Sequence, residues 1–148
     1  MTLEERLKAD LTRAMKEKDE VRTSTLRMLL SDIHYAQIEK GAPLTDQDIQ
    51  AVISKSVKKH QDSIKMYTNG GRDDLAHREE EEAAILMIYL PKQLSRSEIE
   101  RIVEGVIAQT GALTPKEMGK VMQAIMPLVK GKADGKLVSS VVQEKLSK

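Results

Sequence analysis

The 148-residue sequence contains no cysteine, no phenylalanine and no tryptophan. Without cysteine the chain has no disulfide, no thiolate ligand for zinc and no cysteine nucleophile. Because its aromatic residues are three tyrosines, we expect an aliphatic, methionine-rich core, since methionine fills irregular gaps. Stacking of single-stranded bases on aromatic side chains is not expected either.

Long apolar runs are also missing. The longest, residues 83–90, has eight residues, whereas a membrane-spanning helix needs about 20. The first five residues are polar and acidic, unlike an export signal. From these features we expect a cytoplasmic protein that does not contact membranes.

Charge is balanced overall but not along the chain, which has 24 Lys and Arg against 23 Asp and Glu. Residues 1–94 carry 15 basic and 17 acidic residues, a net charge of −2, and residues 95–148 carry 9 and 6, a net charge of +3. The basic surplus in the last third has two interpretations, which are ordinary solvated helix faces or a surface that faces phosphate groups.

Apolar residues recur at steps of three and four throughout, so we expect an all-α protein. The pattern predicts helices over about 3–18, 20–39, 46–68 and 73–90, then 95–111, a helix beginning within one residue of Pro115, and a last helix capped by Asp134. Capping boxes are expected at Thr2 with Glu5, at Ser95 with Glu98, and at Thr114 with Glu117. Pro127 is expected to kink or end the sixth helix.

Pro91 is expected to stop the fourth helix after Leu90, so we place a domain boundary between Pro91 and Ser95. This gives an N-terminal multi-helical domain with long helices, residues 1–94, and a C-terminal three-helix module, residues 95–148. A module of this size is marginally stable alone. We therefore expect it to rest on a partner surface, either the N-terminal helices or another protein.

No catalytic residues and no cofactor are expected. A glutamine-hydrolysing amidase without cysteine would need a Ser-Lys site in a Gly/Ser-rich loop, and the sequence has none. Ser139 and Ser140 fall within a predicted helix. The segment 131–137 fails the P-loop pattern, because three residues separate its glycines where four are required, and Leu137 replaces the Ser or Thr that binds magnesium.

No metal site is expected either. The three histidines, His34, His60 and His77, fall on three separate predicted helices. His77 and Glu81 have the spacing of a two-ligand pair, but such pairs are common on helix surfaces. The run of glutamates at 79–82 points around most of a helix, so we interpret it as a solvated face.

Lysines cluster around the junction of the last two helices. A nucleic-acid surface is predicted at four of them, Lys120, Lys130, Lys132 and Lys136. Turn geometry is assigned to Gly119, Gly131, Asp134 and Gly135. Because Asp134 would occupy the free N–H groups of the last helix, any phosphate contact would come from the lysine side chains. The alternatives are a purely structural turn or a turn that also contacts folded RNA.

Five short motifs in order, at residues 27–30, 71–75, 89–94, 118–122 and 131–135, give the chain a resemblance to the YqeY-like proteins over essentially its whole length. The resemblance implies a C-terminal module similar to the tail of the B subunit of the glutamine-dependent tRNA amidotransferase, a region that helps to hold tRNA. It does not imply that carbon-nitrogen ligase reaction, because the B subunit's ATP-binding cradle has no counterpart in this chain.

The leading hypothesis is therefore a non-catalytic accessory module that binds tRNA, other folded RNA or a tRNA-bearing enzyme. The alternative is a protein-docking module in translation that makes no RNA contact, suggested by Met118, Met122 and Met126. An amide-transfer enzyme remains a third hypothesis, which rests on the family association. Arg27 and Arg72 in the N-terminal motifs either form structural ion pairs, with acids such as Asp73, or face a ligand.

Overall fold

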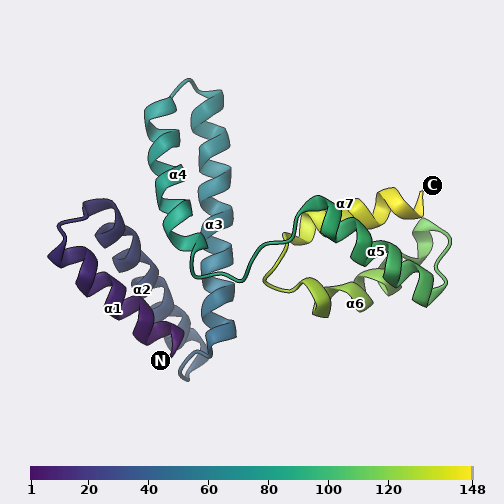
Figure 1. Cartoon of the computed structure of the whole chain (residues 1–148), viewed down its shortest axis with the longest axis horizontal. Helices are drawn as coiled ribbons and strands as arrows, with labels where there is room; N and C mark the ends of the chain where they lie inside the picture. The colour runs from purple at the N-terminus through teal and green to yellow at the C-terminus, as the bar shows by residue number, and fades with distance from the viewer. Residues whose placement is uncertain (148) are drawn as a thin grey trace. The chain divides into compact units, whose positions relative to one another are not determined.

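The structure, a computed structural model, describes residues 1–147 (Figure 1). Over this range the chain forms seven α-helices and one 3₁₀ turn, with no β-strand, which confirms the all-α prediction. Packing divides the chain into two compact units, one of residues Met1–Leu90 and one that begins at Pro91. Each unit has its own core.

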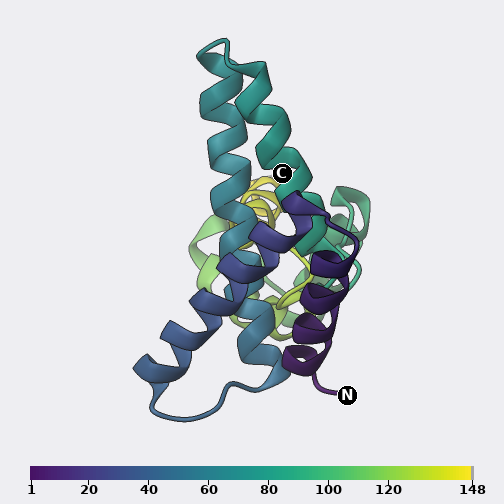
Figure 2. The ribbon, with the colours of Figure 1, turned by 90° about the vertical axis from the view of Figure 1, so that its left-hand side faces the viewer.

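The N-terminal unit contains α1 (Leu3–Lys16), α2 (Glu20–Lys40), α3 (Asp46–Asn69) and α4 (Asp73–Met87). Helix α1 packs against α2, and α3 lies alongside α4 as a long hairpin in both views (Figures 1 and 2). Capping boxes at Thr2 and Thr45 begin α1 and α3, and Gly41 ends α2 in the left-handed conformation.

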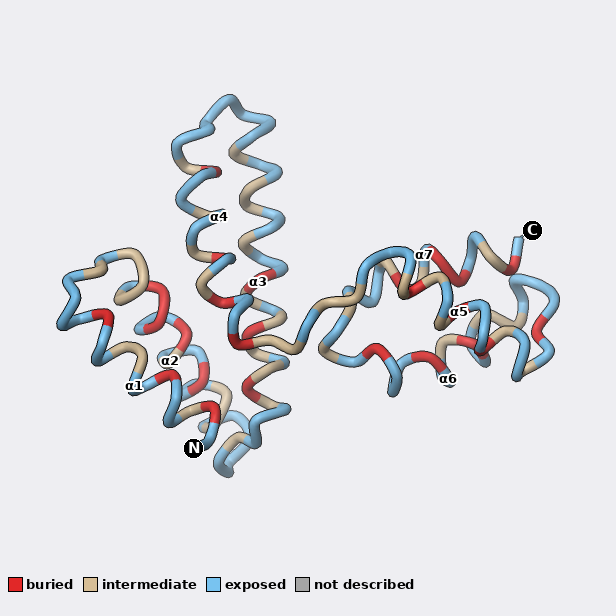
Figure 3. The backbone as a smooth tube through the Cα atoms, in the orientation of Figure 1, coloured by how far each residue is buried: buried red, intermediate tan, exposed pale blue. Residues whose placement is uncertain are grey.

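The core of this unit is aliphatic apart from Tyr89, but the prediction that it is methionine-rich is wrong. No methionine lies among the buried core side chains of residues 1–147. Buried residues recur along each helix between exposed positions (Figure 3). The central buried residues are Leu7, Leu26, Leu29, Ile33, Ile49, Ile53 and Leu86. Because leucine, isoleucine and valine fill this interior, the methionines are left to partly or fully exposed positions.

Helix α4 ends at Met87, three residues earlier than predicted. The N–H of Tyr89 donates to the carbonyl of Leu86, and that of Leu90 to the carbonyl of Met87, so the chain tightens into a turn before Pro91. The turn buries Tyr89, whose hydroxyl donates to Asp10 at 2.6 Å. The α-helix therefore ends before Pro91, and a tertiary hydrogen bond holds Tyr89 in the turn that follows it.

The C-terminal unit contains α5 (Arg96–Thr110), the 3₁₀ turn η1 (Pro115–Glu117), α6 (Met118–Val129) and α7 (Gly135–Leu146). The predicted capping box at Ser95 is present, and Gly111 ends α5 in the left-handed conformation. The three α-helices enclose a core that consists largely of Ile99, Val103, Val121, Ile125, Val138, Val141 and Val142.

The start of α6 differs from the prediction. Thr114 makes no side-chain capping bond, and the Glu117 carboxylate accepts from the N–H of Leu113. The segment after Thr114 is therefore a 3₁₀ turn, and α6 begins at Met118. Pro127 does not end α6, which continues for two residues and buries Val129. No helix within residues 1–147 combines the length and the apolar character needed to cross a membrane.

Candidate functional site

The turn that joins α6 to α7 is held by its own backbone. The N–H of Lys130 donates to the carbonyl of Met126 at 3.0 Å, and that of Lys132 to the carbonyl of Val129 at 2.8 Å. Gly131 has φ 77°, where a side chain would be strained. Because these bonds close the end of α6, the turn has a defined shape.

Two hydrogen bonds from the segment that precedes α5 also hold this turn. The N–H of Leu94 donates to the carbonyl of Lys132 at 2.8 Å. The side-chain amide of Gln93 donates to the carbonyl of Gly131 at 3.0 Å. The two carbonyls are therefore occupied, and the lysine side chains of the turn are exposed to solvent.

Three of the four predicted lysines lie on this turn or at the start of α7. Lys130, Lys132 and Lys136 are exposed and form no ion pair with any other residue in the range 1–147. Asp134 is the one acidic residue among them, and its side chain accepts from the N–H of Lys136 at 3.2 Å. The predicted N-cap is thus present, and the lysines outnumber the acid three to one.

Lys120 is not part of this group. It lies near the other end of α6, ten residues before Lys130, which corresponds to about 15 Å along a helix. Its ammonium group donates to the carbonyl of Thr110 at 3.3 Å. Lys120 therefore helps to hold the end of α5 against the start of α6.

Of the three glycines assigned to turn geometry, Gly131 has a positive φ. Gly119 is the second residue of α6 and Gly135 the first of α7, and both have helical positions without a positive φ. A Cβ added at either would meet nothing within 4 Å. The conformation therefore calls for glycine at Gly131, and no contact calls for it at Gly119 or Gly135.

The two motif arginines of the N-terminal unit behave differently. Arg72 pairs with Asp74 through two bonds of 3.3 Å, and its guanidinium holds the pKa of the Asp74 carboxyl below its usual range. Arg27 is exposed and lies 3.8 Å from the sulfur of Met15, with no acidic partner in the described chain. The structural ion pair is confirmed for Arg72, although its partner is not Asp73.

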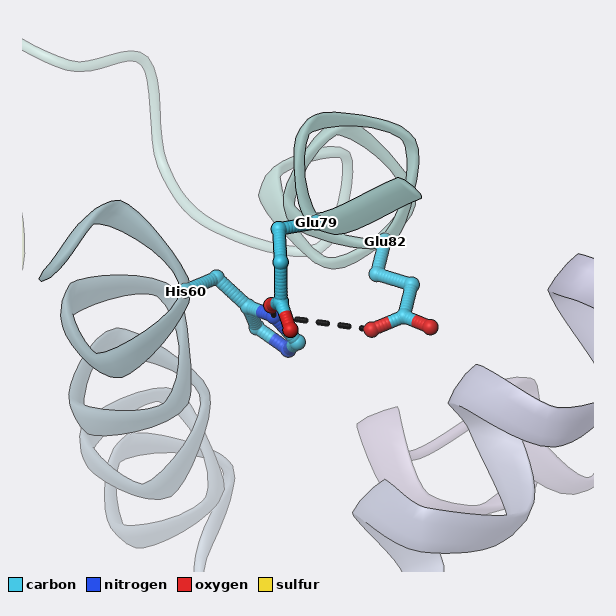
Figure 4. A group of neighbouring side chains, drawn as sticks. All are labelled: His60, Glu79 and Glu82. Atoms are coloured by element: carbon cyan, nitrogen blue, oxygen red, sulfur yellow. Dashed lines mark hydrogen bonds and ion pairs between the residues drawn. The ribbon is translucent and has the colours of Figure 1, made fainter. Parts of the chain in front are cut away.

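A second cluster joins α3 to α4 in the N-terminal unit. The Nδ1 atom of His60 forms a hydrogen bond with Oε2 of Glu79 and lies 3.6 Å from Oε2 of Glu82 (Figure 4). All three side chains are partly buried, with 14%, 22% and 21% of their surfaces exposed. The sequence prediction of a solvated glutamate face is therefore wrong for Glu79 and Glu82.

The sequence reasoning missed this cluster because it treated the four glutamates as a block. Residues three apart on a helix share a face, so Glu79 and Glu82 point the same way. The sequence did contain a signal for the cluster. A histidine lies on the helix before the two glutamates, the glutamates are three residues apart, and a short loop joins the two helices. His77 and Glu81, the pair considered from the sequence, lie on the exposed side of α4 with Nε2 and Oε1 3.0 Å apart.

Relatives of the chain include several fungal proteins named altered inheritance of mitochondria protein 41, mitochondrial. That of Pyrenophora tritici-repentis is 30% identical over 144 residues, covering 94% of this chain and 78% of the relative. Those of Lachancea thermotolerans and Saccharomyces cerevisiae are 34% and 32% identical, covering 74% and 79% of this chain. The chain spans less than two thirds of these last two, 60% and 63%.

These names correct one expectation. A cytoplasmic localisation was predicted from the absence of an export signal, and it is contradicted because the relatives are named as mitochondrial proteins. The model of the YqeY-like protein family matches residues 4–146, which include both units. The chain therefore belongs to the YqeY-like family.

Proposed function

We propose that the C-terminal unit binds folded RNA of the tRNA type through Lys130, Lys132 and Lys136, and that the protein acts as a non-catalytic accessory module. The observation that carries the proposal is three exposed ammonium groups without ion-pair partners in the described chain, two of them on a turn of defined shape and the third at the start of α7. The RNA phosphate backbone is the ligand that such groups suit.

The side chains of the turn are suited to recognise the shape of an RNA and not its base sequence. Lysine is a point charge on a flexible stem and does not read bases as an arginine fork does. The turn offers no aromatic side chain for stacking. The expected contact is therefore with the phosphate backbone of a folded RNA. Ammonium groups alone supply no activated nucleophile, so the proposed role includes no amide transfer.

The test is a fluorescence-anisotropy titration of labelled bulk tRNA with the intact chain. The variant combining Lys130→Ala, Lys132→Ala and Lys136→Ala is expected to bind more weakly. A matched control combines Lys55→Ala, Lys59→Ala and Lys65→Ala, which removes three exposed charges from α3. The proposal is wrong if the turn variant binds like the unmodified chain, or if the α3 variant loses more affinity.

A gain of binding offers an independent check. Asp134→Asn keeps an N-cap acceptor for α7 and removes the negative charge among the lysines. Tighter tRNA binding with unchanged helix content is the expected result. Weaker binding by a correctly folded Asp134→Asn variant would contradict the electrostatic account.

The second candidate function is protein docking without RNA contact. It is favoured by apolar side chains beside the turn, Met126 with 40% and Leu128 with 53% of their surfaces exposed. Met118 and Met122, also named from the sequence, are partly buried against the core and so offer less surface. Docking predicts that a protein partner stays bound at high salt and that Leu128→Gln abolishes this binding. Under the RNA proposal, Leu128→Gln should leave tRNA binding unchanged.

A further inference from the structure

The His60 cluster brings three metal-binding groups to one point between α3 and α4. One imidazole nitrogen and one oxygen from each of Glu79 and Glu82 all lie within 4.8 Å of one another. An ion about 2.0–2.2 Å from each donor would separate the donors by roughly 3–4 Å. Small side-chain rotations therefore suffice to bind an ion, and Figure 4 shows the three groups converging from the two helices.

Neighbouring groups orient the cluster. The guanidinium of Arg78 donates to Oε1 of Glu82 at 3.0 Å and to the hydroxyl of Ser24 on α2 at 3.3 Å. This leaves Oε2 of Glu82 directed toward His60. Outer partners of this kind commonly hold the carboxylate ligands of metal sites.

A buried polar atom beside the cluster is left without a partner. The side-chain oxygen of Thr25 has no hydrogen bond, and the residue is only 7% exposed. Thr25 lines a cavity of about 50 Å³ together with His60 and Glu82. A water molecule needs roughly 10–15 Å³ of such space, so waters on the open positions of an ion could donate to Thr25.

Charge and donor type indicate the class of ion. The cluster contains two carboxylates, and the guanidinium of Arg78 donates to one of them, that of Glu82, so two negative charges meet one fixed positive charge among these contacts. Imidazole with carboxylates suits divalent first-row transition metals, whereas calcium prefers six to eight oxygens. We propose that His60, Glu79 and Glu82 bind a divalent transition-metal ion such as Zn²⁺, which links α3 to α4.

The test is isothermal titration of the untagged, chelator-treated full chain with Zn²⁺, repeated with Co²⁺ to record its visible spectrum. One site is expected, and His60→Gln or Glu79→Gln should weaken it by more than about tenfold. The matched control is His77→Gln with Glu81→Gln, which removes an exposed histidine–glutamate pair from the same helix and should leave the affinity unchanged. Absence of binding, or loss of binding in this control alone, would overturn the proposal.

Two further measurements guard against misfolding. Circular dichroism must show unchanged helix content in each variant, and Zn²⁺ should raise the melting temperature of the unmodified chain but not that of His60→Gln. Thr25→Val keeps all three ligands and removes only the unpartnered hydroxyl. It is expected to fold normally and to bind Zn²⁺ more weakly, and an unchanged affinity would contradict the role given to Thr25.

Discussion

Tyr89 shows how one residue joins the helices of the N-terminal unit. The residue is 3% exposed, its hydroxyl donates to Asp10 on α1, and the guanidinium of Arg6 lies 4.8 Å from the ring centre. The same residue lies in the turn that ends α4. The burial of Tyr89 therefore fixes α1 to the end of α4. Tyr89 belongs to the motif at residues 89–94, for which the sequence suggested no contact.

The ionisation of Tyr89 predicts a pH dependence. Burial, and then its hydrogen bond to the Asp10 carboxylate, raise the pKa of Tyr89 above its usual range. Below about pH 10 the phenol is protonated in both states, and above it the unfolded chain loses a proton that the folded chain keeps. The free energy of unfolding should therefore fall as the pH rises above about 10, as urea titrations can measure.

Tyr89→Phe is the control for this effect, because it removes the ionisable group and keeps the ring. It should be less stable at neutral pH by about 1–2 kcal/mol and should lose less stability in alkali. Ultraviolet absorbance of the folded protein, compared with that of Tyr89→Phe, should show that Tyr89 ionises only above the usual range of a phenol. Ionisation of Tyr89 within that usual range would contradict its burial.

His60 marks the limit of residue-level prediction. Its type and its helix were clear from the sequence, but its partners lie 19 and 22 positions later on another helix. Helical periodicity places residues on faces and does not say which faces meet. The same limit explains why Lys120 was grouped with the turn lysines although it lies at the other end of α6.

Helix ends, by contrast, were predictable wherever local chemistry decides them. The capping boxes at Thr2 and Ser95 and the cap at Asp134 are present as expected. The capping box expected at Thr114 is absent, because the Glu117 carboxylate accepts from the N–H of Leu113 and not from that of Thr114. This bond is also local, but it is shifted by one residue. Sequence patterns thus predict that a cap exists more reliably than which pair of residues forms it.

The two capping boxes expected in the C-terminal unit, of which one is present, predict unequal costs on substitution. Ser95→Ala removes a hydroxyl that accepts from the N–H of Glu98 and should lower stability by about 1 kcal/mol. Thr114→Ala removes a hydroxyl that makes no capping bond and should cost much less. Urea unfolding measures both, and equal costs would show that Thr114 caps a helix in solution.

Two glycines of the C-terminal unit, Gly131 in the turn and Gly119 at the start of α6, form a second matched comparison. Gly131→Ala places a side chain at φ 77° and should destabilise by roughly 1–2 kcal/mol. Gly119→Ala adds a methyl group to an open helical position and should stabilise by about 0.5–1 kcal/mol. Stabilisation by Gly131→Ala, measured by thermal unfolding, would contradict the left-handed turn.

At the scale of the whole molecule, the chain consists of two helical units with separate cores. The all-α class could be read from apolar periodicity, because this signal is local. The aliphatic identity of the core was also predictable, but the exclusion of methionine from it was not. It depends on how the helices fit together.

Separate cores predict separate folding. Residues 91–148 expressed alone should show helical circular dichroism and unfold cooperatively in urea. Because so short a segment forms only a small core, its free energy of unfolding should be below about 5 kcal/mol. The intact chain should then unfold in two steps. A disordered fragment would instead show that the C-terminal unit depends on a partner surface, as the sequence analysis expected.

The most direct test of the central claim is the salt dependence of tRNA binding by the intact chain and its turn variant. Affinity for RNA decreases as salt rises, so the slope of log affinity against log salt is negative. If Lys130, Lys132 and Lys136 each contact a phosphate, this slope should become shallower by about 3 when all three become alanine. The α3 variant lacking Lys55, Lys59 and Lys65 should keep the original slope. Equal slopes for the turn variant and the unmodified chain would contradict the assignment of RNA binding to this turn.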